Sequence, residues 1–425
     1  MNRIILIGNG FDLAHKMKTS YSDFISFYWD KISKEIVDCS VLGKVSYTDE
    51  NLFIKNIPYG LSKTGNYEVI KELTKRGLII EYKNKFLERL NQKHTELSWV
   101  DIEDEYYSCL KSSLQQPVMY PIKTLNKEFL IIQNLLEEYL ITIEDDFQKS
   151  FPRSLEHRSL QSDINNVIYS DFVLNDFSES AVNRIVEEEF QKVINHVKDL
   201  EQIRVSSEQL SNTVDEYTLR LVNSLKYSDD KKRKIRKLLL SKSSSNYFLY
   251  QPKEIIFVSF NYTSLENFYN IAPRYPKNLE VMTESIHIHG LLNNRRDNKI
   301  IFGFGDEIDS SYNEIENKND NDYLENIKSI KYLESDSYKK LLEFINSDEY
   351  QILIFGHSCG ISDRTLLNTL FEHKNCCSIK PYYREKPDGS DNYSDIIRNI
   401  SRNFTNKATM RDRVVNKVYT EAIFK

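Results

Sequence analysis

The sequence predicts an α/β protein in which one parallel sheet is built from both ends of the chain around a large helical insertion. A short apolar run at residues 4–7 is followed by a glycine turn, and similar runs return only after residue 254. Between them, residues 87–240 carry apolar side chains at helical spacing. Because the first run has no earlier partner, the simplest arrangement pairs it with the later strands.

This arrangement divides the chain into three segments. Residues 1–60 are the first part of a nucleotide-binding α/β domain, and residues 61–250 are the helical insertion. Residues 251–425 are the second part of the α/β domain. Within this last part, a polar stretch near residues 306–336 predicts an exposed insertion.

The turn after the first strand is the first candidate binding feature. Residues 4–7 run directly into Gly8, Asn9 and Gly10, and such a run indicates a strand buried on both faces. The glycines permit close approach to the main chain, and backbone amides before a helix favour an anion. Leu13 stands where G-x-G-x-x-G needs its third glycine, and no P-loop motif is present. The turn alone leaves a nucleotide loop and an ordinary strand-to-helix turn both open.

The middle of the chain predicts helices and core packing. The first helix is expected to end near Asp38, and residues 39–80 are expected to be irregular because they are rich in turn-forming residues. Farther on, two apolar stripes recur at a spacing typical of the buried face of a helix. The stripes are Leu125, Phe129, Ile132, Leu136, Leu140, Ile143 and Phe147, and Ile185, Val186, Phe190, Val193, Ile194, Val197 and Leu200.

Composition limits the classes of function. The net charge is −6, with 57 basic and 63 acidic residues, so nucleic acid is not an expected partner. The basic run Lys231–Lys237 indicates a solvated helix end, and contact with a nucleic acid or another acidic partner is the alternative. Five cysteines without C-x-x-C spacing favour a reducing compartment. With no signal peptide before the first strand and no membrane-spanning apolar stretch, we expect a cytoplasmic protein without a membrane partner.

Strands return in the second part of the chain. In parallel sheets ligands bind outside the carboxyl ends of the strands, so the polar residues there are candidate site residues. Two short helices are expected after the last strand. The predicted strands are residues 254–260, 285–289, 300–302, 351–355 and 378–383.

Two of these strand ends carry residues suited to catalysis. Asn261 either caps the next helix or takes part in a site. His287 and His289 alternate with isoleucines and face one side of a strand, but no cluster with metal-ligand spacing accompanies them, so no metal is expected. We interpret His287 as a satisfied core histidine. His289 precedes Gly290 at an open strand end and is a candidate general base.

A third strand end contains a second glycine turn. Gly356, His357 and Ser358 precede a helix that we expect to begin at Asp363, with Ser362 as its cap. Such a turn suits phosphate groups or ribose hydroxyls. An ordinary strand-turn-helix connection, with Asp363 complementing the helix dipole, is the alternative.

The order of these features resembles known proteins. A glycine turn after the first strand, then S-x-N-Y, then H-G, then G-x-S before a helix is similar to the Rossmann-type NAD fold of sirtuins. The chain more closely resembles the AbiH family of phage abortive-infection proteins, over nearly its whole length. The motifs that carry this resemblance are ILIGNGFDLAH (5–15), KTSYSDF (18–24), WVDIE (99–103), VSFNYTSLE (258–266), HIHG (287–290), IFGFGD (301–306) and FGHSCGISD (355–363).

The resemblance implies NAD as a substrate, cleaved without a metal. Asn261 would orient a water or the ribose, and His289 would be the base. The implied NAD-binding residues are Gly8, Asn9, Gly10 and Asp12 at the pyrophosphate and nicotinamide ribose, Thr19, Ser20 and Tyr21 at the nicotinamide, Gly356 and Ser358 at the adenosine ribose and phosphates, Asp363 at the helix start, and Ser259, Tyr262 and Gly290 within the matching motifs.

The chain also departs from the sirtuin pattern. Sirtuin-like NADases usually carry Asp two places after the Asn, whereas this chain has Thr263, and Asp12 either caps a helix or holds a ribose hydroxyl. No zinc-ribbon cysteine set is present, so a protein deacylase is not expected. Trp99, Asp101 and Glu103 match the AbiH motif; helix initiation explains part of it, and Glu103 is positioned to reach back to the sheet.

The resemblance therefore implies an anti-phage effector that, when triggered, hydrolyses the nicotinamide–ribosyl bond of NAD. A nucleotide sensor that binds without turnover is the first alternative, favoured by Thr263 and the altered glycine loop. A nuclease or RNA-targeting toxin, based on Lys231–Lys237 and the acidic residues 101–105, is the second. Because such an enzyme must be held inactive, we expect a homo-oligomer or an inhibitory element, and a phage-derived or operon-encoded trigger.

Overall fold

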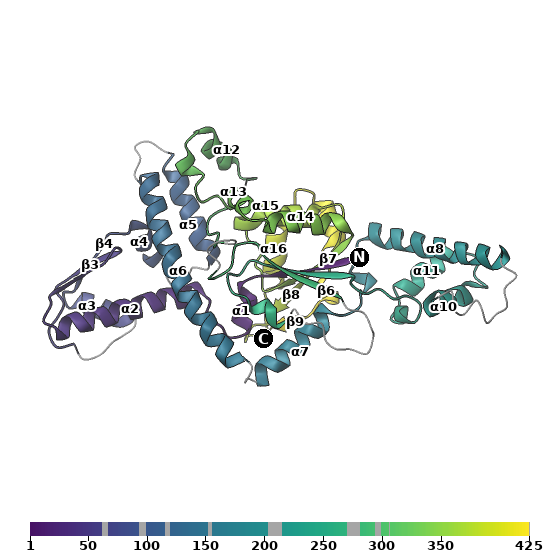
Figure 1. The fold of residues 1–425 in the computed structure, drawn as a ribbon, viewed down its shortest axis with the longest axis horizontal. Coiled ribbons are helices and arrows are strands. Elements are labelled where there is room, and N and C mark those ends of the chain that lie inside the picture. Colours follow the sequence, from purple (N-terminus) through teal and green to yellow (C-terminus); the bar gives the residue numbers. More distant parts are fainter. Residues whose placement is uncertain are drawn as a thin grey trace.

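The protein has a central parallel sheet with a helical lobe at each end of the long axis (Figure 1). The structure is a computed structural model of the chain. It describes residues 1–61, 67–92, 99–114, 120–151, 155–202, 215–269, 281–293, 299–305 and 307–424.

The central sheet contains six parallel strands in the order β6-β5-β1-β7-β8-β9. β1 pairs with β5 on one side and with β7 on the other, which confirms a sheet built from both ends of the chain. Numbered along the chain, this order is 3-2-1-4-5-6, the order of doubly wound sheets that bind dinucleotides where the order reverses. The strands are β1 Asn2–Ile7, β5 Glu254–Ser259, β6 Met282–His287, β7 Tyr350–Phe355, β8 Cys376–Arg384 and β9 Ala422–Phe424.

Some strands differ from the prediction. β6 begins and ends earlier than residues 285–289, so His289 lies beyond the strand. Residues 300–302, predicted as a strand, form none. The reason is that Phe302 packs into the first helical lobe, where its ring stacks on Phe129 with 4.9 Å between the ring centroids.

The region predicted to be irregular, residues 39–80, contains part of a second sheet. Its three strands pair antiparallel in the order β2-β3-β4, beside the helix α3. Each strand has only three or four residues, too few for a period of two to be recognised in the sequence. The elements are β2 Ser46–Thr48, β3 Leu52–Lys55, α3 Tyr67–Lys75 and β4 Ile79–Tyr82.

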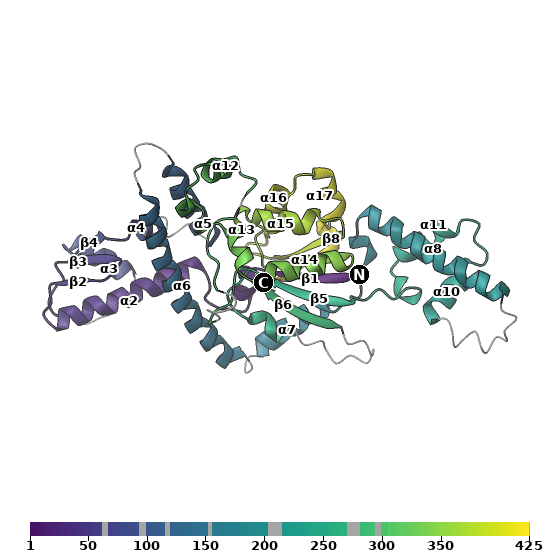
Figure 2. The same cartoon turned by 45° about the horizontal axis from the view of Figure 1, so that its top comes forward.

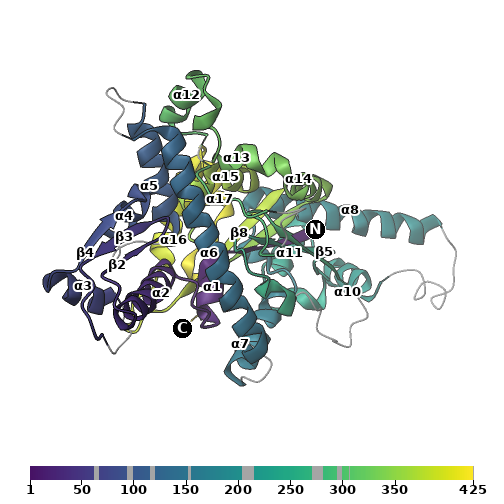
Figure 3. The same ribbon diagram turned by 60° about the vertical axis from the view of Figure 1, so that its left-hand side comes forward.

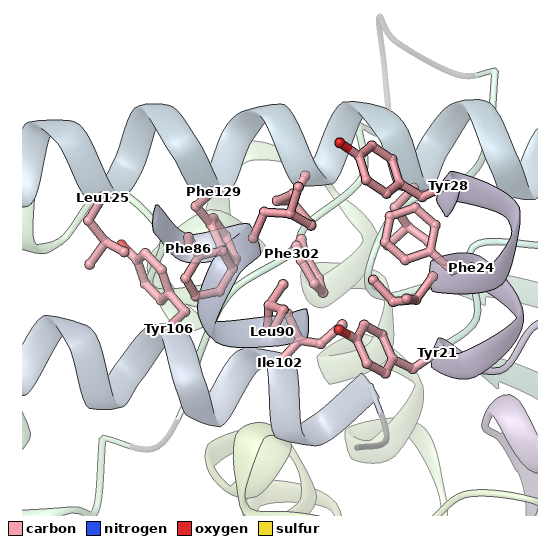
Figure 4. Packing of buried hydrophobic residues seen from close by; sticks show 14 of the residues in the cluster. Tyr21, Phe24, Tyr28, Phe86, Leu90, Ile102, Tyr106, Leu125, Phe129 and Phe302 are labelled. Carbon is pink, nitrogen blue, oxygen red and sulfur yellow. The ribbon is translucent and has the colours of Figure 1, made fainter. Parts of the chain in front are cut away.

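The first helical lobe lies at the left of Figure 1. Where one helix was predicted there are two, because Lys16 adopts a left-handed backbone (φ 63°) and Ser20 then caps α2 in a capping box with Asp23. Aromatic side chains of α2, α4, α5 and α6 meet around Phe302 in the core of this lobe (Figure 4). The helices are α1 Asn9–Ala14, α2 Tyr21–Val41, α4 Lys85–Gln92, α5 Trp99–Ser112 and α6 Ile122–Ser150.

The second helical lobe lies at the right of Figures 1 and 2 and has its own core. The basic run forms α11, whose Ile235 and Leu239 are buried. Two of its cations, Lys232 and Arg236, pair with carboxylates of α8. The basic run is therefore the exposed face of a packed helix, in line with its interpretation from the sequence as a solvated helix end. The helices are α8 Glu179–Gln202, α10 Glu216–Leu225 and α11 Lys231–Leu239.

Helices cover both faces of the sheet. α7 lies below the sheet in Figure 2, and α14 to α17 lie above it. α6 runs from the first lobe past α1 toward α7 (Figure 3). None of the described helices is long and apolar enough to cross a membrane. The bounds are α7 Leu155–Ile168, α12 Ser310–Asn317, α13 Lys328–Lys331, α14 Ser337–Ser347, α15 Arg364–Glu372, α16 Tyr393–Asn403 and α17 Lys407–Arg413.

The polar stretch near residues 306–336 is not uniformly exposed, contrary to the prediction. Ile327, Lys328 and Tyr332 are buried, the lysine with only 1% of its surface exposed. An isolated bridge joins Ile327 to Phe304, whose ring stacks on Tyr107 in the core of the first helical lobe. The apolar residues of the segment are spaced among charged ones, which hides their burial from a reading of composition.

Candidate functional site

A pocket of about 390 Å³ opens at the carboxyl ends of β1, β5 and β7. It is lined by residues that follow each of these strands, in the segments 8–10, 260–263 and 356–358. Here the strand order reverses, which is where doubly wound sheets bind their ligands. Side chains from other elements complete the lining, among them Glu103 of α5 and Lys328 of α13.

The two glycine turns of this pocket pack against each other. The amide of Gly10 donates a 2.8 Å hydrogen bond to the carbonyl oxygen of Gly356, whose φ is +67°. A Cβ on Gly8 would lie 2.5 Å from Cα of His357, and one on Gly10 would lie 2.7 Å from the carbonyl oxygen of Gly356. The close contact between the turns is therefore sufficient to require these glycines, with or without a ligand.

Asp12 lies in the wall of the pocket with 1% of its surface exposed. Its Oδ1 accepts a hydrogen bond from Nδ2 of Asn261 at 2.8 Å, and its Oδ2 accepts one from the hydroxyl of Thr263 at 2.7 Å. Burial raises the pKa of Asp12 to about 7, and these two hydrogen bonds offset only part of that rise. A carboxyl group with this pKa can take up or release a proton near neutral pH.

The side chain of Asn261 is held in place by two hydrogen bonds that its amide nitrogen donates. Besides Asp12, its Nδ2 donates to the carbonyl oxygen of Gly8 at 3.2 Å, so both amide hydrogens have partners. Asn261 caps no helix, since the short 3₁₀ turn Leu265–Phe268 that follows has Ser264 at its N-cap. Within the described residues its side-chain oxygen has no hydrogen-bond partner, so it can accept a hydrogen bond in the pocket.

A buried ion network borders the other side of the pocket. Nζ of Lys328 lies 2.8 Å from Glu103 and 2.9 Å from Oδ1 of Asp363. Burial alone would raise the pKa of Asp363, but Lys328, His289 and His357 hold it well below the ordinary range. Burial raises the pKa of Glu103, and the lysine only partly offsets this. One lysine thus faces two carboxyl groups, which favours retention of a proton within the network.

Both pocket histidines face Asp363. Nε2 of His289 lies 3.1 Å from Asp363 and 3.3 Å from the hydroxyl of Tyr332, and a further hydrogen bond joins the ring to the backbone of Phe260. Burial and the neighbouring Lys328 lower the pKa of His289, so its neutral form is favoured. Nε2 of this histidine is thus already engaged by two protein groups.

His357 is a neutral histidine with an assigned tautomer. Its Nδ1 accepts a hydrogen bond from the amide of Cys359 at 2.9 Å, so the ring hydrogen resides on Nε2. Burial lowers the pKa of His357 to about 4. Its Nε2 is 3.7 Å from Oδ2 of Asp363, longer than a direct hydrogen bond. His357 therefore supplies a dipole, and no full charge, beside Asp363 at neutral pH.

Two further predictions concern the start of α15 and the role of His287: the first is off by one residue, and the second agrees with the structure. α15 begins at Arg364, one residue later than expected, and the Asp363 carboxylate makes no capping hydrogen bond because it faces Lys328 and His289 instead. His287 is a buried, satisfied histidine as interpreted: Nε2 is 2.9 Å from Glu266. Burial lowers its pKa, but Glu266 outweighs this and raises it overall.

A family model described as "Bacteriophage abortive infection AbiH" matches residues 4–383. The chain belongs to the AbiH family. The match runs from β1 into β8 and includes the pocket residues from Gly8 to Tyr382, but not Arg384. The family's description indicates a role in phage abortive infection. No curated protein and no solved structure matches the chain.

This AbiH protein gathers most of its predicted site residues in one pocket. Four lie elsewhere: Ser20 caps α2, Tyr21 is in the core of the first lobe, Ser259 bonds the backbone of Asn261, and Gly290 (φ +85°) packs on the carbonyl of Lys299. Asn9, in the lining, accepts a 2.7 Å hydrogen bond from Thr19. The predicted residues that line the pocket are Gly8, Asn9, Gly10, Asp12, Thr19, Asn261, Tyr262, His289, Gly356, Ser358 and Asp363.

Sequence reasoning missed two charged residues of the AbiH pocket, Lys328 and Arg384. Neither lies in a recognisable motif, and Lys328 belongs to a stretch whose composition suggested exposure. Glu103 does reach back to the sheet domain as suggested, through Lys328, whereas the side chains of Trp99 and Asp101 lie outside the described residues. Among the residues that the structure describes, no group of three His, Cys, Asp or Glu side chains is arranged to hold a metal ion.

Proposed function

We propose that this AbiH protein is an abortive-infection effector that binds NAD in the pocket and hydrolyses its nicotinamide–ribosyl bond. The observation that carries the proposal is the arrangement of Asn261 beside Asp12. The amide group of Asn261 is fixed, its oxygen is available to hold a water, and the adjacent carboxyl group has a pKa of about 7. An oriented water next to a proton acceptor suits attack on an anomeric carbon.

The reaction assigns a task to each of these groups. As the bond from C1′ of the ribose to nicotinamide breaks, its electron pair leaves with nicotinamide, which departs as a neutral molecule. The ribose becomes oxocarbenium-like, and a nearby carboxylate stabilises that charge. Water held by Asn261 forms the new C–O bond, and its proton passes to Asp12. Thr263, bonded to Asp12, keeps the carboxylate directed at the pocket.

Asp12 also accounts for the departure of this chain from the sirtuin pattern. The residue two places after Asn261 is Thr263, and its hydroxyl donates to Asp12. A carboxyl group is thus present beside this position, supplied by α1 and not by the segment after β5. This supports a site of the same chemical type with its acid on a different element.

In this proposal His289 is not the base that accepts the proton of the attacking water. Because Asp363, Tyr332 and the backbone of Phe260 already engage its ring, we assign proton uptake to Asp12. His289 instead positions Asp363 and, through it, Lys328. Its loss is expected to weaken the site indirectly.

The direct test incubates purified protein with NAD and measures released nicotinamide and ADP-ribose by chromatography. The wild type should release both in equal amounts, and Asn261→Ala should lower kcat by about 100-fold or more, in the range lost with a single oriented polar group. Asn346→Ala, an exposed substitution on α14, is the matched control and should leave kcat unchanged. Absence of nicotinamide release from a wild type known to arrest cell growth would reject hydrolysis.

A nucleotide sensor without turnover is the second candidate. The observation in its favour is that Asp12, Asn261 and Thr263 satisfy one another's hydrogen bonds, as in a stable binding wall. In cells, Asn261→Ala should abolish growth arrest if cleavage causes it, and leave arrest largely intact if binding alone does. Cellular NAD should also be compared, before cells lyse, between the wild type and His289→Ala. A fall in NAD confined to the wild type indicates cleavage, and steady NAD during growth arrest indicates binding alone.

A further inference from the structure

Charge is distributed unevenly along the pocket. Its buried side contains the carboxyl groups of Asp12, Glu103 and Asp363 with a single lysine among them. Its exposed side contains Arg384, the last residue of β8. Among the described residues no carboxylate forms an ion pair with this guanidinium, whereas Lys328 has two such partners. Arg384 is therefore the cation of the lining that can neutralise a ligand.

The backbone of Arg384 is held firmly although its side chain is exposed. Its amide donates a 2.7 Å hydrogen bond to Oδ1 of Asn392, and it pairs with Phe424 of β9. Asn392 and Ser358 also line the pocket. A guanidinium on a fixed strand end, in a lining that also contains an amide and a hydroxyl, offers several directed donors to an anion.

The strand order places Arg384 far from the proposed reaction centre. β8 is separated from β5, which leads into Asn261, by three strand spacings, or about 14 Å. It is two spacings from β1, which leads into Asp12, or about 10 Å. A ligand that touched both sides would have to be elongated, with an anionic group away from its reactive bond.

We propose that Arg384 binds the phosphate groups of the nucleotide, and so sets its direction in the pocket. This rests on the proposed function, because it identifies the ligand as NAD. In NAD the nicotinamide ring is cationic and the pyrophosphate is anionic. The carboxyl groups of the buried side complement the ring, and Arg384 complements the phosphates. The nicotinamide–ribosyl bond then lies at Asn261 and Asp12.

The test compares three substrates that share this bond: NAD, nicotinamide mononucleotide, which lacks the adenosine, and nicotinamide riboside, which also lacks phosphate. Arg384→Gln should lower kcat/KM for NAD and for the mononucleotide by about tenfold or more, as expected for loss of a charge-assisted hydrogen bond. It should leave nicotinamide riboside unchanged. Arg384→Lys should recover part of the loss, since it keeps a point charge.

Two controls make this comparison specific. Arg402→Gln removes an exposed arginine of α16 that does not line the pocket, and should match the wild type with all three compounds. Raising the salt concentration should reduce the wild-type advantage over Arg384→Gln, because screening weakens an exposed charge interaction.

The outcomes separate this inference from the proposed function. Equal losses for all three compounds, or none, would overturn the phosphate assignment. A loss for NAD alone would also overturn it and indicate stacking of Arg384 on adenine. If the wild type cleaves none of the compounds, the proposal that the protein hydrolyses NAD is rejected. Binding of the same three compounds, measured by calorimetry, then tests the assignment of Arg384 to the phosphates. Weaker binding of the two phosphate-bearing compounds to Arg384→Gln would uphold it, and unchanged binding or no binding to the wild type would reject it.

Discussion

Asp12 and Asp363 are both buried carboxyl groups in one pocket, but their surroundings are opposite. Asp12 accepts hydrogen bonds from a neutral amide and a neutral hydroxyl, and the two acidic residues Glu266 and Glu144 add to the rise in its pKa. Asp363 faces Lys328 and two histidines. Burial favours the neutral form of both, and only the partners of Asp363 overcome it.

The difference teaches that burial does not by itself assign a carboxyl group its role. With neutral partners Asp12 has a pKa of about 7 and can exchange a proton during a reaction. With cationic and polar partners the pKa of Asp363 lies far below neutrality, so it remains a fixed negative charge. Pairs of acids driven apart in this way are a common basis for dividing catalytic roles.

The largest effect is expected from removing Lys328, the cation that lies between Glu103 and Asp363. Lys328→Met removes the cation from between Glu103 and Asp363 and leaves both carboxyl groups buried without it. We expect a loss of about 3–5 kcal/mol in the free energy of unfolding, measured by urea denaturation. Lys340→Met, which removes an exposed pair with Asp336, is the matched control and should cost less than about 1 kcal/mol.

The reason for this loss can be tested within the same network. Adding Glu103→Gln to Lys328→Met removes one of the two stranded carboxylates, so part of the lost stability should return. If Lys328→Met is no less stable than the surface control, or if the second substitution brings no recovery, the network does not contribute in the way described.

The sheet and much of the Asp12 side could be predicted from the sequence. Strands buried on both faces appear as continuous apolar runs, so β1, β5 and β7 were visible, and the residues after them were the natural candidates. Their mutual contacts were not visible. The hydrogen bond from Asn261 to Asp12 spans 249 positions and depends on the register of β1 against β5.

The Asp363 side could be predicted only in part. Lys328 contacts Glu103 and Asp363 across 225 and 35 positions, and nothing local marks a lysine as buried. The charged composition around it suggested an exposed insertion instead. The glycines of the two turns were recognised, but their main reason, a contact between turns almost 350 positions apart, needed the structure.

The next effect concerns pH and should distinguish the two acids. The folded protein keeps a proton on Asp12 up to a pKa of about 7, whereas the unfolded chain releases it near 3.8. Between these values the folded state binds more protons, so its stability falls as pH rises. Relative to Asp12→Asn, the wild type should lose up to about 1.4 kcal/mol per pH unit from pH 5 to 7, and nothing further above pH 8.

The same urea titrations, repeated at each pH, provide the controls. Asp145→Asn, an exposed substitution on α6, should follow the wild type at every pH. Asp363 has the opposite sign, since its contribution is present above the ordinary carboxyl range and is lost only on acidification below it. Relative to Asp363→Asn, which keeps Asp12, the wild type should therefore show no such loss between pH 5 and 7. A wild-type curve parallel to Asp12→Asn would refute a raised pKa for Asp12.

The smallest effect sharpens the account of Asp12 itself. Thr263→Val keeps the shape of the side chain but removes the hydroxyl that donates to Oδ2 of Asp12 at 2.7 Å. Because this hydrogen bond favours the ionised form, its loss should raise the pKa of Asp12 further and move the pH window upward by less than about one unit. The stability lost should be about 1 kcal/mol. Thr369→Val removes a hydroxyl that bonds a backbone carbonyl within α15, so it should cost a similar amount of stability and leave the pH window in place. A window that stays fixed in both variants would mean that Asn261 alone sets the hydrogen bonding of Asp12.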